Sequence, residues 1–277
     1  MKTKFCVYFL FLFLFFAPAA GFAEGQNVSA VLSQEIANGG TIDFSPFFGV
    51  VRLPAGITIH FLMLIISSVM IVGLFLYSMR TAALKPKGIL VVIESLIAFV
   101  QEDIVFPVMG KEKGEKWLPF FCTLFLFIVT INLLGLIPCF KTATGNINVT
   151  TALAVMVLFL VFIVGIKNLG ICKFFVNLYP HGAARPIGLF VAFLEFAGIF
   201  VKITILSLRL FANMFAGHLA IFSFLMLIFV LSPMAGLFAV PFTIFTYLLE
   251  IIISLIQALV FTLLSCIFIT MASTVHE

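Results

Sequence analysis

Charged residues that recur at helical spacing stand out in the last third of this sequence. Glu195, Lys202 and Arg209 are spaced by seven residues, so on an α-helix successive members differ by only about 20° and form one stripe. Asn213, one turn after Arg209, extends the stripe. A charge near the centre of a bilayer costs at least about 2.5–3.5 kcal/mol, and such residues typically belong to ion or proton pathways. We therefore expect this stripe to face protein or a water-filled cavity.

A second polar set follows on the neighbouring apolar segments. His218 lies nine residues after Arg209 and hence about 180° away from the stripe. Glu250 and Gln257 are again seven apart and share one face of their own helix. If the two helices run antiparallel from a turn at Pro233, Arg209 and Gln257 meet at one level. His218 and Glu250 then meet at another level, nearer the outside.

Structural roles remain alternatives for part of this set. Packing or interhelical hydrogen bonding stays open for Glu195, Lys202, Asn213, His218 and Gln257. Glu250 favours function, because a buried carboxyl must be protonated, paired or hydrated. Arg209 keeps its charge at any ordinary pH, which disfavours an unpaired structural role. His60, at the outer end of the first apolar segment, is expected to be interfacial, with a role in proton access as the alternative.

The composition places these residues in a membrane. The chain has 277 residues, of which 15 are Lys or Arg and 11 are Asp or Glu, and 64% are apolar. These values exclude an ordinary soluble domain, a disordered chain and a basic nucleic-acid binder. The five Cys are single residues without a CxxC pair, which indicates neither a disulfide framework nor a metal site. We predict an all-α polytopic membrane protein that needs no cofactor and binds no nucleic acid.

The N-terminus has the pattern of a secretory signal. Residues 1–23 combine Lys2 and Lys4, an apolar run of about 12 residues and a small-residue cleavage site, and this pattern predicts a signal peptide. An uncleaved anchor is the alternative. The polar segment 24–56 is expected to be periplasmic, and residues 57–277 form the membrane domain.

The membrane domain contains about five apolar segments that could cross a bilayer. They cover residues 57–79, 117–139, 149–166, 187–231 and 237–270. Nine Lys and Arg lie in the loops on one side, namely Arg80, Lys85, Lys87, Lys111, Lys113, Lys116, Lys167, Lys173 and Arg185. The positive-inside rule therefore places the mature N-terminus outside and the C-terminus in the cytoplasm. An apolar run at 89–100 predicts an interfacial helix on the cytoplasmic side.

The last two segments are too long for upright crossing. A helix over 187–231 would measure about 67 Å, against a hydrocarbon core of about 30 Å. We expect a strongly tilted antiparallel hairpin over 187–270, with its turn at 232–236, where Pro and Gly interrupt the pattern.

The polar residues lie in motifs that resemble a known family. Residues 206–218 read LSLRLFANMFAGH and resemble subunit a of the F-type ATP synthase, the membrane stator beside the rotating c-ring. Further matching positions are Asn132 to Pro138 (NLLGLIP), Asn148 to Thr150, Glu195, Glu250 and Gln257. Ala212 and Ile203 depart from the commoner Gly and Pro of the family. His218 and Glu250 occupy positions that hold Glu and His, respectively, in some bacterial members.

The resemblance implies a function in proton transport. It implies that Arg209 faces the ring carboxylates and that two aqueous half-channels reach the ring from opposite sides of the membrane. His218, Glu250, Gln257, Asn213 and Glu195 would belong to the proton path. The implied partners are the c-ring, the peripheral-stalk subunit b, the F1 sector and the lipid bilayer, and the signal favours a bacterial plasma (inner) membrane. Such a chain is not an enzyme by itself.

A stand-alone secondary transporter or ion channel is the alternative function. Intramembrane charges would suit it, but such proteins are often built from internal repeats, and none is evident in this sequence. A transporter would work alone, whereas a stator subunit needs its ring.

Overall fold

The structure is a computed structural model that describes residues 41–43, 50–52, 59–80, 89–137, 142–170, 185–230 and 236–273. The predicted signal peptide and most of the hairpin turn lie outside these residues. The chain divides into two compact units, each built from distant parts of the sequence. Unit 1 combines Met1–Val72, Val129–Asn146 and Ala212–Leu255, and unit 2 combines Gly73–Ile128, Ile147–Phe211 and Ile256–Glu277.

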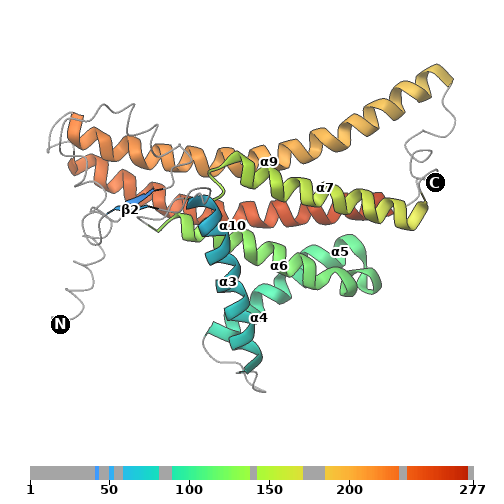
Figure 1. Cartoon of the computed structure of the whole chain (residues 1–277), viewed down its shortest axis with the longest axis horizontal. Helices are drawn as coiled ribbons and strands as arrows, with labels where there is room; N and C mark the ends of the chain where they lie inside the picture. The colour runs from blue at the N-terminus through green and yellow to red at the C-terminus, as the bar shows by residue number, and fades with distance from the viewer. Residues whose placement is uncertain are drawn as a thin grey trace. The chain divides into compact units, whose positions relative to one another are not determined.

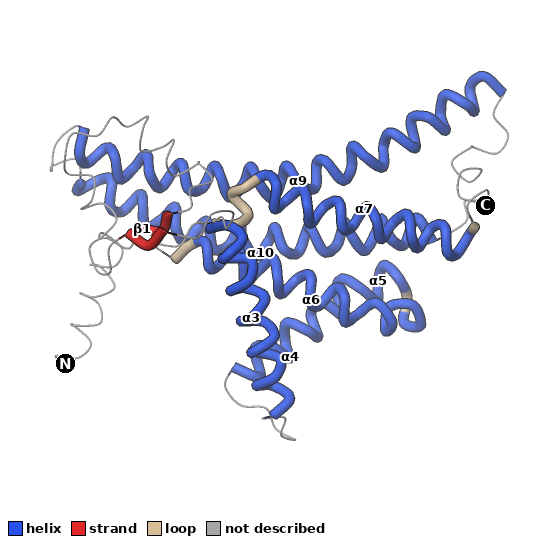
Figure 2. Tube along the Cα trace, viewed as in Figure 1, coloured by secondary structure: helices blue, strands red, loops and turns tan. Residues whose placement is uncertain are grey.

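Helices dominate the described residues (Figures 1 and 2). They are α3 (Ile59–Arg80), α4 (Ile89–Phe99), the π-helix η1 (Val100–Val105), α5 (Phe106–Met109), α6 (Lys111–Gly135), α7 (Ile147–Leu169), α9 (Arg185–Val230) and α10 (Gly236–Ser273). The predicted all-α class is confirmed.

A short β-ladder is the exception within the helical chain. Strands β1 (Thr41–Asp43) and β2 (Val50–Arg52) pair antiparallel, with Ile42 opposite Val51. Both strands contain β-branched residues, which suit a pleated backbone. They lie in the predicted N-terminal segment 24–56, for which the sequence predicted no regular structure.

Four of the described helices are long and apolar enough to cross a membrane. They are α6, α7, the part of α9 over Ile187–Leu227, and α10. α3 has 22 residues, but its described apolar stretch, His60–Leu76, is shorter. These five helices follow the order of the five predicted segments, and the number of actual crossings stays a prediction.

The predicted cytoplasmic helix over 89–100 is also present. α4 covers most of the run, and the chain continues directly into η1, which buries Val100, Ile104 and Val105 and exposes Glu102 and Asp103. This amphipathic pattern fits a helix that packs on one face only. Its location at the membrane interface stays a prediction.

The two long helices are unbroken, as expected. α9 has 46 residues and α10 has 38, which correspond to about 69 Å and 57 Å of helix. Within unit 1 their paired parts run antiparallel, because Phe224 stacks on Phe242 with ring centroids 5.7 Å apart and His218 meets Glu250. The antiparallel hairpin is therefore confirmed for this part, and its tilt in the membrane stays a prediction.

In unit 2, one face of α9 is buried and the opposite face is exposed. Ile203, Leu206, Ser207 and Leu210 are buried at helical spacing. The Ser207 hydroxyl donates to Oγ1 of Thr150 at 3.2 Å, which links this face to α7. The rotation of this part of α9 is thus set by one packed side.

The two faces predict different costs for the same substitution. Leu206 is 1% exposed and Leu208 is 45% exposed. Leu206→Ala should leave a cavity and lower the unfolding free energy by about 1–3 kcal/mol. This loss is smaller than for most buried leucines of soluble proteins, because lipid is as apolar as the protein interior and burial from lipid gains less. Leu208→Ala should have little effect, since lipid or detergent refills the space. Thermal unfolding of the purified chain in detergent measures both, and equal shifts would contradict the assigned faces.

Candidate functional site

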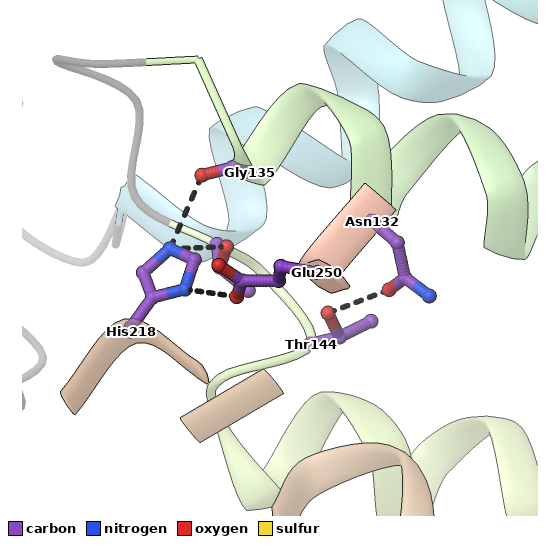
Figure 3. A network of polar contacts seen from close by, with 6 residues as sticks. Asn132, Gly135, Thr144, His218 and Glu250 are labelled. Atoms are coloured by element: carbon purple, nitrogen blue, oxygen red, sulfur yellow. Dashed lines mark hydrogen bonds and ion pairs between the residues drawn. The ribbon is translucent and has the colours of Figure 1, made fainter. Parts of the chain in front are cut away.

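A half-buried histidine and a buried glutamate join α9 to α10 within unit 1. His218 Nδ1 lies 2.8 Å from Oε1 of Glu250, and Glu250 is 4% exposed (Figure 3). The sequence placed these two residues at one level of an antiparallel hairpin, and the structure confirms that they meet. A buried carboxylate is costly unless it is paired and hydrogen-bonded, so each residue depends on the other.

The other side of the His218 ring faces two oxygens. Nε2 lies 3.2 Å from the carbonyl oxygen of Gly135, the last residue of α6 (Figure 3). It also lies 3.1 Å from Oγ1 of Thr142. Both ring nitrogens of His218 therefore have polar partners within unit 1. The imidazole is held on two sides, which fixes its orientation.

His60 of α3 belongs to the same network. It is 6% exposed, and its Nδ1 donates to the backbone carbonyl of Thr142 at 3.1 Å. The sequence suggested an interfacial residue, with proton access as the alternative. Thr142 therefore connects His60 to the pair of His218 and Glu250, because it contacts both histidines.

A buried amide holds the segment that carries Thr142. The Thr144 hydroxyl donates to Oδ1 of Asn132 at 2.8 Å, and both side chains are buried (Figure 3). The backbone N–H of Asn146 donates to the carbonyl of Ala143 at 3.1 Å. This short segment therefore turns tightly against the end of α6.

Two glycines permit the close packing of this network. A Cβ on Gly217 would lie 2.6 Å from Oε1 of Glu250, and a Cβ on Gly135 would overlap the side chain of Thr142. Real Cβ atoms do not approach other heavy atoms so closely. Glycine is thus required at both positions for the observed side-chain placement.

One oxygen of the Glu250 carboxyl has no hydrogen-bond partner among the described residues. This oxygen, Oε2, is buried. A buried carboxyl oxygen in this state is typically protonated, hydrated or functional.

The charged stripe of α9 behaves differently. Glu195, Lys202 and Arg209 are all exposed in unit 2, and their spacing of seven on the unbroken helix α9 places them on one face. Within the described part of the chain, none of the three side chains forms an ion pair or a hydrogen bond. Arg209 is therefore not neutralised by a described carboxylate.

Two amides of the predicted site are half-buried. Asn213 lies in unit 1 and Gln257 in unit 2. The predicted meeting of Arg209 with Gln257 produces no hydrogen bond between their side chains among the residues described.

The sequence did not predict several members of the network. Thr142 and Thr144 were not singled out, and Asn132 and Gly135 entered only as part of a matching motif. The one available signal was the placement of two threonines soon after that motif. Among the described residues, no three His, Cys, Asp or Glu side chains lie close enough together to hold a metal ion.

Long apolar helices that bury a histidine and carboxylate network define a polytopic α-helical membrane protein.

Comparisons with known proteins refine this class. Residues 61–270 match the family described as "ATP synthase A chain". The chain is 39% identical to "ATP synthase subunit a 2" of Prosthecochloris aestuarii, over 94% of this chain and 85% of the relative. It is 37% identical to "ATP synthase subunit a" of Pelodictyon phaeoclathratiforme, over 94% and 81%, respectively. The chain therefore belongs to the ATP synthase A chain family.

The close approach of Gly217 to Glu250 predicts a position-specific effect of an added methyl group. Gly217→Ala should displace the Glu250 carboxyl and lower the melting temperature of the purified chain. Gly198→Ala on the same helix is the matched control, because a Cβ there meets nothing within 4 Å, and it should leave stability unchanged or raise it by up to about 1 kcal/mol.

A double substitution tests the cause of the Gly217→Ala effect. In a Glu250→Ala background the obstructing carboxyl is gone, so Gly217→Ala should cost less than it does alone. Additive effects would show that the methyl group acts elsewhere.

Proposed function

We propose that this chain is the proton-translocating subunit a of an F-type ATP synthase. In this role it forms two aqueous half-channels against the c-ring and couples proton flow to rotation and ATP synthesis. Membership in the family and the names of the relatives support a place in the ATP synthase complex. The partners are then the c-ring, the peripheral-stalk subunit b and the F1 sector through the stalks.

The proposal rests on the surroundings of the Arg209 side chain. Its guanidinium is exposed on an apolar helix and has no ion pair among the described residues. A permanent cation in a membrane requires an anionic or aqueous partner. A ring of carboxylates outside this chain supplies such a partner, and the cation lowers the proton affinity of each carboxylate that approaches it.

His218 and Glu250 serve as the proton intake from the outside. Their hydrogen-bonded pair can pass a proton between an imidazole and a carboxyl, and His60 lies next to them through Thr142. From this level the proton passes to a ring carboxylate. Once neutral, that carboxylate can turn into the lipid.

The release side uses the charged stripe. After nearly a full rotation the carboxylate meets Arg209 and loses its proton to the cytoplasmic half-channel, for which Glu195 is a lining residue. Asn213 and Gln257 hydrogen-bond water molecules along the path. Lys202 adds a positive charge to the exposed face that carries Arg209. Arg209 also blocks a direct leak, because its fixed charge repels a proton that hops between the two half-channels.

The energy comes from the membrane potential. Each proton that falls through 100 mV releases about 2.3 kcal/mol, so several must pass for each ATP. We place the synthesis of ATP on partner subunits. The chain lies in a bacterial inner membrane, with a periplasmic mature N-terminus and a cytoplasmic C-terminus, as its loop charges indicate.

The role of Arg209 predicts loss of coupling when its charge is removed. Arg209→Ala should reduce ATP-driven proton pumping in membrane vesicles at least tenfold, to background, with the complex still assembled. Lys167→Ala is a control that removes an exposed cation of α7 outside the proposed path, and it should pump normally. Normal pumping by Arg209→Ala would refute the proposal.

The two residues of α10 should contribute unequally. Glu250→Gln removes the proton acceptor and should slow pumping at neutral pH, whereas Gln257→Ala removes only a neutral hydrogen-bonding group and should have a smaller effect. Initial rates of vesicle acidification compare the two. Equal and negligible effects of the two substitutions would contradict the role of Glu250 in proton intake.

A further inference from the structure

Two oxygens opposite Glu250 determine where hydrogens can sit on the His218 ring. The carbonyl oxygen of Gly135, 3.2 Å from Nε2, can only accept a hydrogen bond. A neutral imidazole carries one N–H, and the lone pair of an unprotonated Nε2 would face the lone pairs of this carbonyl. The geometry therefore favours a hydrogen on Nε2 and leaves Nδ1 as the nitrogen whose proton can change.

We propose that the Gly135 carbonyl and the Thr142 hydroxyl hold His218 in the Nε2–H tautomer, so that the exchangeable proton lies between Nδ1 and Oε1 of Glu250. Gly135 and Thr142 are then positioning residues of the proton path. The inference rests on the proposed function for its purpose, but the tautomer itself is a property of the network.

The proton balance is simple in this arrangement. In one state Glu250 is a neutral acid whose O–H donates to the Nδ1 lone pair of a neutral imidazole. In the other state the O–H bond breaks, the proton binds Nδ1, and an imidazolium donates to a carboxylate at the same 2.8 Å contact. Nε2–H stays in place in both states, and the total number of protons in the pair does not change.

Thr142 links this arrangement to α3. Its hydroxyl lies 3.1 Å from Nε2 and can accept from Nε2–H beside the Gly135 carbonyl, while its own backbone carbonyl accepts from Nδ1–H of His60. His60 thereby holds Thr142 in place, and Thr142 in turn orients the His218 ring. Gly135 must lack a Cβ because a side chain there would overlap Thr142.

The titratable neighbours of His218 among the described residues of unit 1 are few. α10 supplies Glu250 in direct contact, and α3 supplies His60 through Thr142. The end of α6 and the segment after it supply the neutral oxygens of Gly135 and Thr142. Glu250 is thus the titratable side chain that contacts the ring directly.

The direct test observes the ring nitrogens. We would assemble the complete ATP synthase in membranes with ¹⁵N-labelled histidine in this subunit alone and assign the His218 signals by their loss in His218→Gln. Solid-state NMR should show Nε2 protonated throughout pH 6–8, and any difference in protonation between samples should be confined to Nδ1. An unprotonated Nε2 in the neutral ring would overturn the inference.

Substitutions at Thr142 separate positioning from folding. Thr142→Val keeps the shape but removes the hydroxyl, and pumping should fall about fivefold, the change expected for one ordinary hydrogen bond. Its pH profile should also shift, because the ring loses a partner. Thr142→Ser retains the hydroxyl and should restore both rate and profile, and failure of this rescue would indicate that Thr142 acts only by packing and would contradict its assigned role.

The outcomes also separate this inference from the function on which it rests. If Arg209→Ala and Glu250→Gln pump normally, the proposed function fails whatever the tautomer. If those variants fail to pump but His218 carries its hydrogen on Nδ1, only the positioning role of Gly135 and Thr142 fails.

Discussion

The cost of placing polar and charged groups in apolar surroundings governs this structure. Few residues of the membrane domain are charged, and every one inside an apolar helix needs a partner, a proton or water. The Glu250 carboxyl is paired with His218 inside the chain. Arg209 has no described partner in its own chain and is exposed. The first arrangement suits a group that exchanges a proton within the protein, and the second suits a group whose partner is another subunit.

Backbone spacing is as important to the network as the titratable groups. Gly217 and Gly135 let neighbouring side chains approach to hydrogen-bond distance, and Asn132 with Thr144 fixes the segment that presents Thr142. A proton path needs donors and acceptors at stable separations, because small displacements break hydrogen bonds. Neutral residues therefore set the geometry in which His218 and Glu250 can share a proton.

The sequence predicted the features that follow from helical periodicity and length. The long helices and the single stripe that carries Arg209 follow from a repeat of 3.6 residues. The meeting of His218 with Glu250 was predicted from the same repeat and from an expected turn near Pro233. The sequence did not predict Thr142 beside His218, because the stretch between α6 and α7 has no periodicity from which a position could be calculated. The β1 and β2 ladder was missed for a related reason, since three-residue strands carry too little pattern.

Cysteine cross-linking tests the central claim that the exposed face with Arg209 meets the ring. Leu208 is on this face and Leu206 is on the packed face of the same helix. In an assembled complex without native cysteines, Leu208→Cys should form a disulfide with a cysteine placed beside the ring carboxylate, and Leu206→Cys should not. Cross-linking from Leu206→Cys alone, or from neither position, would show that this face of α9 does not meet the ring.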